Sequence, residues 1–479
     1  MAKTADIESI LRKVTKRETI SQTDRRRVES LAEKLRRRVE EKVRQRGASA
    51  EVTLEGSIAK DTWLKHGADI DIFMLIPSSV KREKLTSTYL PLAKESMNGF
   101  RCTERYAEHP YLNVQVATDI EVNIVPCYDV EPSNWKSATD RTPYHTKYVK
   151  KHLGNRQKND VRLLKRFMKG IGVYGADIKV GGFSGYLTEL LIIHYGGFTP
   201  TLNASRRWKL KGVIDCENYY GGRAEEVEKL FDEPLIVIDP VDRCRNVASA
   251  VTPNAFYLFS AAAKFFLKKP KLTFFYPPAV KPLDVAGLCR VLEARRTDIL
   301  FLEFGKVRAV PDILWGQLYK TQRAISNLLR QHNFNVLRSA VWSDEVRSNI
   351  LLFELEASTL RGVKKHYGPP ALSTEEDRFL PKYLSSPITV SGPTIEAGRW
   401  AVLIKREYRN AEFLLREKLV GSGRGLGVGS RVAEALEKGF KVMLNGEMAK
   451  FCEKQPPFTA FLTDFLRGTP TWLSKVSGC

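Results

Sequence analysis

The chain has 479 residues, of which 43% are hydrophobic, and its formal net charge is +22. Its length exceeds what one compact core usually supports, and its hydrophobic fraction excludes a disordered chain, so we expect two to four folded domains. A basic surplus of this size is typical of proteins that bind a polyanion, and it favours nucleic acid as a partner.

The cysteines and the hydrophobic pattern indicate the cellular compartment in which the protein is expected. The seven cysteines are odd in number and no two form a C-x-x-C pair, so neither a disulfide framework nor a zinc site is indicated. The first residues lack a signal-peptide pattern, and no apolar run is long enough to span a membrane. We therefore expect a cytoplasmic protein.

The first 150 residues mix helical and strand patterns. Residues 5–46 are charged and carry a narrow apolar stripe, which predicts an amphipathic helical segment. Strands are predicted at 52–54, 69–76, 112–116 and 119–125, and helices at 61–65 and 80–97. These elements predict a small mixed α/β domain.

The rest of the chain begins with helical patterns and then changes. Helices are predicted at 160–168, 184–194 and 254–267. The segments 298–304, 312–331, 335–342 and 349–357 then read strand, helix, strand, strand, which is half of a ferredoxin-like unit. A strand at 398–408, a glycine-rich link and a helix at 431–445 complete the prediction.

The stretch from Gly56 to Asp71 suits a nucleotide and a metal ion. Asp69 and Asp71 are two residues apart in a predicted strand, so their side chains share one face. Gly56 lets the backbone approach a phosphate closely, and Ser57 can then bind phosphate oxygens. Short carboxylates suit Mg²⁺, and two such ions can neutralise a triphosphate. A Gly-Ser turn twelve residues before D-x-D is typical of nucleotidyltransferases.

Further stretches resemble a known family. They read G-S-I-A-K-D-T-W-L-K (56–65), R-Y-A-E-H-P-Y (105–111), I-V-P-C-Y (124–128), D-R-T-P-Y-H (140–145), V-R-L-L-K (161–165), V-Y-G-A (173–176), G-F-S-G-Y-L-T-E-L-L (182–191) and D-P-V-D-x-x-R-N-V-A (239–248). Together they are similar to the archaeal-type, class I CCA-adding enzymes, which are tRNA nucleotidyltransferases of the DNA-polymerase-β superfamily. The similarity continues more weakly toward the C-terminus.

The resemblance implies an α+β multidomain fold. Its parts are a polymerase-β-like nucleotidyltransferase head (1–150), a helical neck (151–270), a ferredoxin-like body (271–370) and an α/β tail (371–479). It implies template-independent addition of C, C and A to the 3′ end of tRNA from CTP and ATP, with two Mg²⁺ ions. The implied partners are the tRNA acceptor end and nucleoside triphosphates, with no membrane, and a homodimer is one option for the assembly.

The family's functional residues are carried over by position. Asp69 and Asp71 match the metal carboxylates. Ser57 and Lys60 match triphosphate contacts, with Lys60 standing where arginine is common.

Four further positions match nucleotide contacts of the family. His145, Lys165 and Tyr174 match nucleotide-binding residues, and Arg245 matches one that contacts the base edge or phosphate. The chemistry fits, because Lys165 is a point charge for phosphate and the two ring side chains can pack on or hydrogen-bond to ribose and phosphate.

The chain departs from the family at position 123. The family has an acid there, whereas Asn123 carries no charge and cannot act as a base, although its oxygen can ligate a metal. Glu121 lies on the same strand face, about 7 Å away along the strand. Three interpretations stay open. In the first, Glu121 takes the place of the third acid, with Asn123 as an auxiliary ligand. In the second, the third acid is lost, so that the protein binds its substrates but catalyses slowly. In the third, the alignment with the family is shifted.

Two basic stretches are candidates for RNA contact. Arg206 and Arg207 open the run R-R-W-K-L-K and can bind phosphate, while Trp208 is expected to pack. The glycine-rich link 421–429 lacks phosphate-loop spacing, so we expect a flexible loop in which Arg424 could approach the tRNA backbone.

Two alternatives to a CCA-adding enzyme remain. One is a catalytically weak or silent relative that binds tRNA 3′ ends. The other is an oligoadenylate-synthase-like polymerase, which shares the Gly-Ser and D-x-D layout. The V-P-C-Y, D-R-T-P-Y-H and D-P-V-D-x-x-R-N motifs favour the tRNA enzyme.

Overall fold

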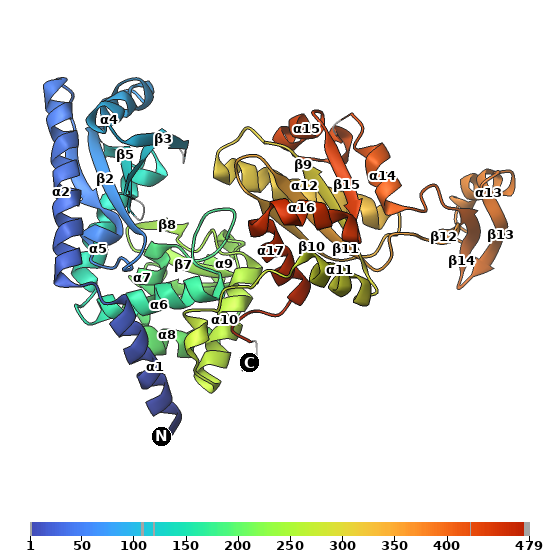
Figure 1. Cartoon of the computed structure of the whole chain (residues 1–479), viewed down its shortest axis with the longest axis horizontal. Helices are drawn as coiled ribbons and strands as arrows, with labels where there is room; N and C mark the ends of the chain where they lie inside the picture. Colours follow the sequence, from blue (N-terminus) through green and yellow to red (C-terminus); the bar gives the residue numbers. More distant parts are fainter. Residues whose placement is uncertain (1, 107–109, 118–119, 422, 474–479) are drawn as a thin grey trace. The chain divides into compact units, whose positions relative to one another are not determined.

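The computed structural model describes residues 2–106, 110–117, 120–421 and 423–473. It divides into two compact units, Met1–Pro278 with Thr469–Cys479, and Ala279–Gly468 (Figure 1). No helix among the described residues is long and apolar enough to cross a membrane.

The first unit opens with a mixed five-stranded sheet in the order β1-β2-β5-β4-β3. Its strands are β1 (Glu51–Glu55), β2 (Ala68–Pro77), β3 (Arg101–Tyr106), β4 (Pro110–Ala117) and β5 (Ile120–Asp129). β2 and β5 are parallel, and the other neighbouring pairs are antiparallel. The predicted strands are all present, while β3 was not predicted.

The helices at the start of this unit differ in part from the prediction. They are α1 (Ala2–Glu18), α2 (Gln22–Gln45), α3 (Gly56–Ala59), the π-helical turn η1 (Leu85–Tyr89) and α4 (Leu90–Ser96). The segment 5–46 is two helices, because Ser21 caps the second by accepting a hydrogen bond from the backbone of Asp24. The helix predicted at 61–65 is wrong. Asp61 has a positive φ of 56° there, which is incompatible with a helix, and the short helix starts at Gly56 instead.

The two faces of the sheet have different environments. Even-numbered residues of β2 from Ile70 to Ile76 are fully buried and pack in one core with α2 and α4. Because side chains alternate along a strand, Asp69 and Asp71 lie on the opposite face. Both carboxylates therefore point away from the apolar core that α2 and α4 form with the sheet.

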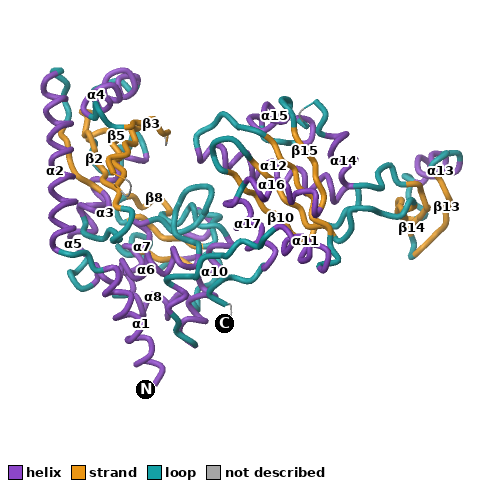
Figure 2. Tube along the Cα trace, in the orientation of Figure 1, coloured by secondary structure: helices purple, strands orange, loops and turns teal. Residues whose placement is uncertain are grey.

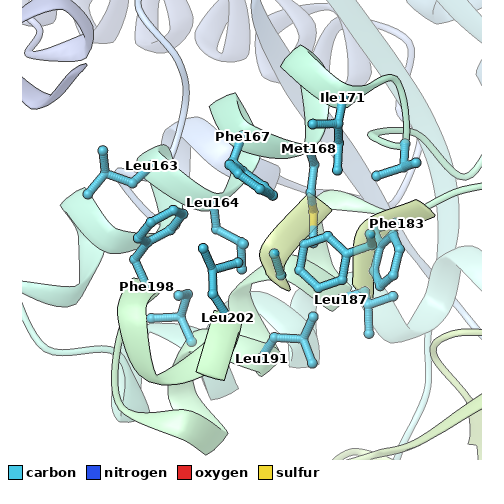
Figure 3. Close-up of a cluster of buried hydrophobic side chains, with 14 of the residues drawn as sticks. Leu163, Leu164, Phe167, Met168, Ile171, Phe183, Leu187, Leu191, Phe198 and Leu202 are labelled. Carbon is cyan, nitrogen blue, oxygen red and sulfur yellow. The ribbon is translucent and has the colours of Figure 1, made fainter. Parts of the chain in front are cut away.

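A helical layer follows in the same unit (Figure 2). It contains the 3₁₀ turn η2 (Ala138–Arg141), α5 (Thr142–His152), α6 (Gln157–Ile171), α7 (Gly185–Tyr195), α8 (Phe198–Ser205), α10 (Pro253–Lys268) and the turn η3 (Leu272–Phe274). Figure 3 shows the core of this layer, where Phe167 of α6, Leu187 of α7 and Phe198 of α8 lie in one buried cluster. The three helices predicted here are present.

A small sheet in this layer was not predicted. Its strands β6 (Gly212–Asp215), β7 (Leu235–Asp239) and β8 (Asp242–Asn246) pair in that order, and α9 (Ala224–Leu230) lies between the first two in sequence. β7 is buried at every residue. Strands of four or five residues give too short a pattern to separate from a buried helical turn.

The second unit is built on an antiparallel sheet in the order β10-β11-β9-β15. Its strands are β9 (Asp298–Phe304), β10 (Val336–Ser343), β11 (Asn349–Leu355) and β15 (Phe440–Leu444). With α12 (Pro311–Gln331) between β9 and β10, this is the ferredoxin-like arrangement that the sequence predicted. The fourth strand comes from beyond residue 371, from the segment expected to be the tail.

Helices cover both faces of this sheet. α12, α14 (Ala411–Lys418) and α15 (Ser430–Leu436) share one core, and α11 (Val285–Ala294), α16 (Ala449–Lys454) and α17 (Pro456–Arg467) share the other, with the turns η4 (Arg424–Leu426) and η5 (Asn445–Met448) between elements. The helix predicted at 431–445 is wrong beyond residue 436. Gly439 has a φ of +127°, and the following residues pair with β9 as a strand.

A separate three-stranded sheet belongs to the same unit. It has the order β12-β14-β13, with strands β12 (Val363–Pro370), β13 (Thr389–Glu396) and β14 (Arg399–Lys405), and α13 (Glu376–Leu384) packs on it. β14 confirms the strand predicted at 398–408.

Glu354 of β11 is a buried carboxylate that joins three segments of the second unit. It is 3% exposed, and it accepts hydrogen bonds from Arg295 and Thr297, both at 2.8 Å, and from Arg338. Burial alone would raise the pKa of Glu354, but the hydrogen bonds from Arg295 and Arg338 lower it to about 2.

The substitution Glu354→Gln is expected to lower the free energy of unfolding by about 3 kcal/mol at neutral pH. The pKa is lower in the folded state, so the stabilisation is complete above the unfolded pKa and is lost as pH falls through about 2. Urea unfolding of both proteins at pH 7 and in steps below pH 5 measures this. A difference that stays constant down to pH 2 would contradict it.

Candidate active site

The D-x-D carboxylates stand beside two polar side chains of the neighbouring strand. In the parallel pairing of β2 with β5, Asp69 lies opposite Glu121, and Asp71 lies opposite Asn123. All four side chains therefore share the face that points away from the apolar core. Position 123 is the strand position next to Asp71.

Hydrogen bonds link these side chains in a chain that ends at Asp71. Asn123 donates from Nδ2 to Asp71 Oδ1 at 3.0 Å. Asn113 of β4 donates from Nδ2 to Asn123 Oδ1 at 2.9 Å and to Glu121 Oε2 at 3.0 Å. Asn113 is buried, and it holds both Glu121 and Asn123 from the side opposite β2.

The electrostatics of the acid pair favour a bound cation. Burial and, to a smaller extent, the nearby Asp69 raise the pKa of Asp71, the hydrogen bond from Asn123 opposes them, and the pKa is about 6 as a result. Burial and the charge of Glu121 likewise raise the pKa of Asp69. Crowded carboxylates whose ionised form is disfavoured are stabilised by a divalent ion, so these residues fit one.

The fit has one limit. Within the part of the chain that the structure describes, no group of three His, Cys, Asp or Glu side chains is placed to hold a metal ion. Glu121 faces Asp69 but is held by Asn113, and it does not complete a three-acid cluster. Asn123 turns its amide nitrogen toward Asp71, so the nearby oxygens that could ligate a metal are those of Asp69, Asp71 and, across the strand pair, Glu121.

Gly56 is required by its distance from Asp71. Its φ is +71°, and a Cβ at this position would lie 2.0 Å from Asp71 Oδ2. No other residue fits without moving the carboxylate. α3 thus brings Ser57, which is half-buried, directly next to the acid pair.

Lys60 and Lys165 meet at a third carboxylate. Lys60 Nζ donates to Glu189 Oε2 at 2.5 Å, and Lys165 Nζ lies 3.4 Å from Glu189 Oε1. Lys165 also donates to the Thr62 carbonyl at 3.1 Å. Both lysines are buried. The structure thus brings together two cationic residues that lie more than a hundred positions apart in sequence.

Tyr174 lies next to Lys165. A Cβ on Gly185 would be 3.2 Å from the Tyr174 hydroxyl and 3.7 Å from Lys165 Nζ, so this glycine of α7 leaves room for both. Burial raises the pKa of Tyr174, and the charge of Glu189 adds to the shift. Its hydroxyl therefore stays protonated as a hydrogen-bond donor.

His145 and Arg245 meet at Asp239. His145 Nε2 is 2.9 Å from Asp239 Oδ2, and Arg245 Nη1 donates to the same oxygen at 2.7 Å. Tyr186 donates to Asp239 Oδ1 at 3.1 Å and stacks on His145 with ring centroids 3.9 Å apart. Burial raises the pKa of Asp239, but His145 and Arg245 outweigh it and lower the value to about 2. The carboxylate is therefore ionised.

The predicted RNA contacts lie in different units. Arg206 and Arg207 are exposed in the first unit, and Trp208 packs among aromatic rings with its indole N–H donating to Tyr195. Arg424 is in the second unit and forms an ion pair with Glu437 at 3.2 Å.

Several polar residues of the site were missed by sequence reasoning. They are Asn113, Thr62, Tyr186, Glu189 and Asp239. Glu189 and Asp239 did carry a signal, because each is a carboxylate inside an otherwise apolar run. That pattern places a charge in a core and so predicts a buried partner.

Family models match successive parts of the chain. The nucleotidyltransferase domain matches residues 33–145, the second domain of tRNA nucleotidyltransferase matches residues 159–276, and the C-terminal domain of CCA-adding enzyme matches residues 295–445. Among solved structures, E. coli MS115-1 CdnC with ATP has a TM-score of 0.43 at 17% identity, covering 56% of this chain and 94% of that one. The match of residues 33–145 to the nucleotidyltransferase domain, together with the mixed sheet and its acid pair, defines a nucleotidyltransferase.

Whole-chain relatives are more specific. The CCA-adding enzyme of Methanosarcina acetivorans is 39% identical over 86% of this chain and 87% of its own length. That of Methanothermobacter thermautotrophicus is 35% identical over 92% of this chain and 94% of its own length. The chain belongs to the family of CCA-adding enzymes.

Proposed function

We propose that this protein adds C, C and A to the 3′ end of tRNA without a nucleic-acid template, using CTP and ATP. The observation that carries the proposal is the pair Asp69 and Asp71 on the open face of β2, with Gly56 and Ser57 against it, in a chain of this family. Cytoplasmic location and a homodimer stay predictions from the sequence.

Each part of the site has a proposed task. Asp69 and Asp71 would hold two Mg²⁺ ions, which would neutralise phosphate charge and polarise the tRNA 3′-hydroxyl. The Asn123 oxygen would join them only after its amide turns, because its Nδ2 donates to Asp71 and its Oδ1 accepts from Asn113. Ser57, Lys60 and Lys165 bind the triphosphate.

The remaining predicted contacts surround the nucleotide and the RNA. Tyr174 and His145 orient the nucleotide, and Arg245 contacts its base or phosphate. The exposed Arg206, Arg207 and Arg424 contact tRNA phosphates.

A second function is supported by one observation. Asn123 stands beside Asp71 where the family has an acid, and no three acids among the described residues form a metal-binding group. This favours a relative that binds tRNA 3′ ends and reacts slowly or not at all. In the alternative in which Glu121 substitutes for the third acid, it acts from opposite Asp69, while its Oε2 accepts a hydrogen bond from Asn113.

One incubation separates these functions. The full chain is mixed with tRNA lacking CCA, Mg²⁺, and labelled CTP and ATP, and the products are resolved at single-nucleotide length. We expect ordered addition of C, C and A at a slow rate. No addition over long incubation would indicate the silent binder, and addition of A alone would indicate the oligoadenylate-type polymerase. tRNA that already ends in CCA serves as the control.

A further inference from the structure

Glu189 is a buried carboxylate without an assigned task. It lies on α7, is 1% exposed, and contacts three polar groups, which are Lys60, Lys165 and the Thr62 hydroxyl at 2.5 Å. An ionised carboxylate in such a place is costly unless it is paired. Its two ammonium partners supply the pairing.

The charges of this cluster do not cancel. One carboxylate faces two ammonium groups, so one positive charge is left over. Burial lowers the pKa of Lys165, and the charge of Glu189 opposes that shift. An anion bound beside the two ammonium groups would neutralise the charge that is left over.

We infer that Glu189 is a positioning residue, which holds Lys60 and Lys165 aligned to receive the triphosphate of the incoming nucleotide. This inference rests on the proposed function of the two lysines. Glu189 does not touch the phosphates, because like charges repel. It acts by fixing two flexible side chains, each of which has several rotatable bonds to immobilise before it can bind.

Glu189 also ties α7 to the segment after α3, so a purely structural role has to be separated. Loss of a structural tie weakens binding of ATP and of AMP in the same proportion. Misaligned lysines weaken the binding of ATP far more than the binding of AMP, because AMP lacks the β and γ phosphates. The ratio of the two affinities therefore distinguishes positioning from folding.

The chain offers a matched control in Glu354. This carboxylate is also buried, and it is also paired with two cations and a threonine hydroxyl, but it lies in the other compact unit. Glu354→Gln thus makes the same chemical change in the same kind of cluster. It should lower stability and leave the ratio of ATP to AMP affinity unchanged.

The test uses Glu189→Gln in the full chain, with Kd for ATP and for AMP measured by equilibrium binding and the KM for ATP measured in tRNA extension. We expect the affinity for ATP to fall about 10-fold or more, as for loss of a charge-assisted contact. AMP affinity should stay within a factor of about two. The KM for ATP should rise more than kcat falls.

Two results would overturn the inference, namely unchanged ATP affinity or equal losses for ATP and AMP. If Glu189→Gln does not fold, Glu189→Asp is used instead. It keeps the negative charge on a side chain shorter by one methylene, and the ratio of the ATP and AMP affinities is measured for that variant. If neither variant folds, Glu189 is structural and the inference fails. Failure of the proposed function is a separate result, because it appears as wild-type protein that does not extend tRNA.

Discussion

Replacing Asn123 with Asp is expected to raise the rate of single-turnover AMP addition on the order of 100-fold, which is the usual size of a catalytic base's effect. The amide of Asn123 donates to Asp71 and accepts from Asn113. An amide can neither take a proton nor add charge to the metal site. A carboxylate in the same position, directly opposite Asp71, can do both.

The same substitution should change the response to Mg²⁺. Without metal, a carboxylate facing Asp71 at hydrogen-bond distance replaces an attractive contact with a repulsive one, so the variant should melt at a lower temperature. Mg²⁺ should then raise the melting temperature of the variant more than that of the wild type. ATP binding in the presence of Mg²⁺ should be near-normal in both proteins.

The measurement is rapid-quench AMP addition to tRNA ending in CC, with enzyme in excess. Glu121→Gln is the informative companion variant. If Glu121 already supplies the third acid, its substitution abolishes the remaining activity, and Asn123→Asp gains little. Rates for wild type and Asn123→Asp that agree within a factor of about two would refute a catalytic deficit at position 123.

The second large effect is expected for Gly56→Ala. The added Cβ would lie 2.0 Å from Asp71 Oδ2, and the positive φ of 71° adds about 1 to 2 kcal/mol of backbone strain. Since Asp71 sits between Asn123 and this glycine, it has to move. We expect nucleotide addition to fall on the order of 100-fold, because small displacements of a catalytic group are that costly.

Gly67→Ala is the matched control for this variant. Gly67 also has a positive φ, of 81°, but a Cβ there would meet nothing within 4 Å. The Gly67→Ala variant should melt at a lower temperature because of the backbone strain, and it should retain the wild-type rate of nucleotide addition. If both variants lose activity equally, backbone strain explains the loss, and the close approach of Gly56 to Asp71 has no special role.

The strands near the site were predictable because their signal is local. β2 alternates buried aliphatic residues with Asp69 and Asp71, and this alternation can be read from the sequence alone. β3 gave a weaker signal, since it is an edge strand in which Arg101 and Thr103 are exposed. β15 was misread as a helix because its strand conformation depends on pairing with β9, well over a hundred residues earlier in the chain.

The buried charge clusters could not be predicted in the same way. Lys60 and Glu189 are separated by 129 residues, and nothing in the pattern around either one names the other. The same holds for His145 and Asp239, which are 94 residues apart. A charge in an apolar run indicates that a partner exists, but the identity of that partner depends on how α5, α6 and α7 pack.

The sequence by itself determined the class of chemistry, because the D-x-D spacing and the preceding Gly-Ser are local features of strand and turn geometry and the further motifs resemble those of one family. It also placed Asn123 where an acid is expected. Only the tertiary structure decided that Asn123 lies opposite Asp71 and that Asn113 donates a hydrogen bond to Glu121. It also decided that Glu189 forms ion pairs with two lysines. The reason is physical: side-chain direction along a strand follows from the chain itself, whereas strand register and the pairing of buried charges arise only when distant segments pack together.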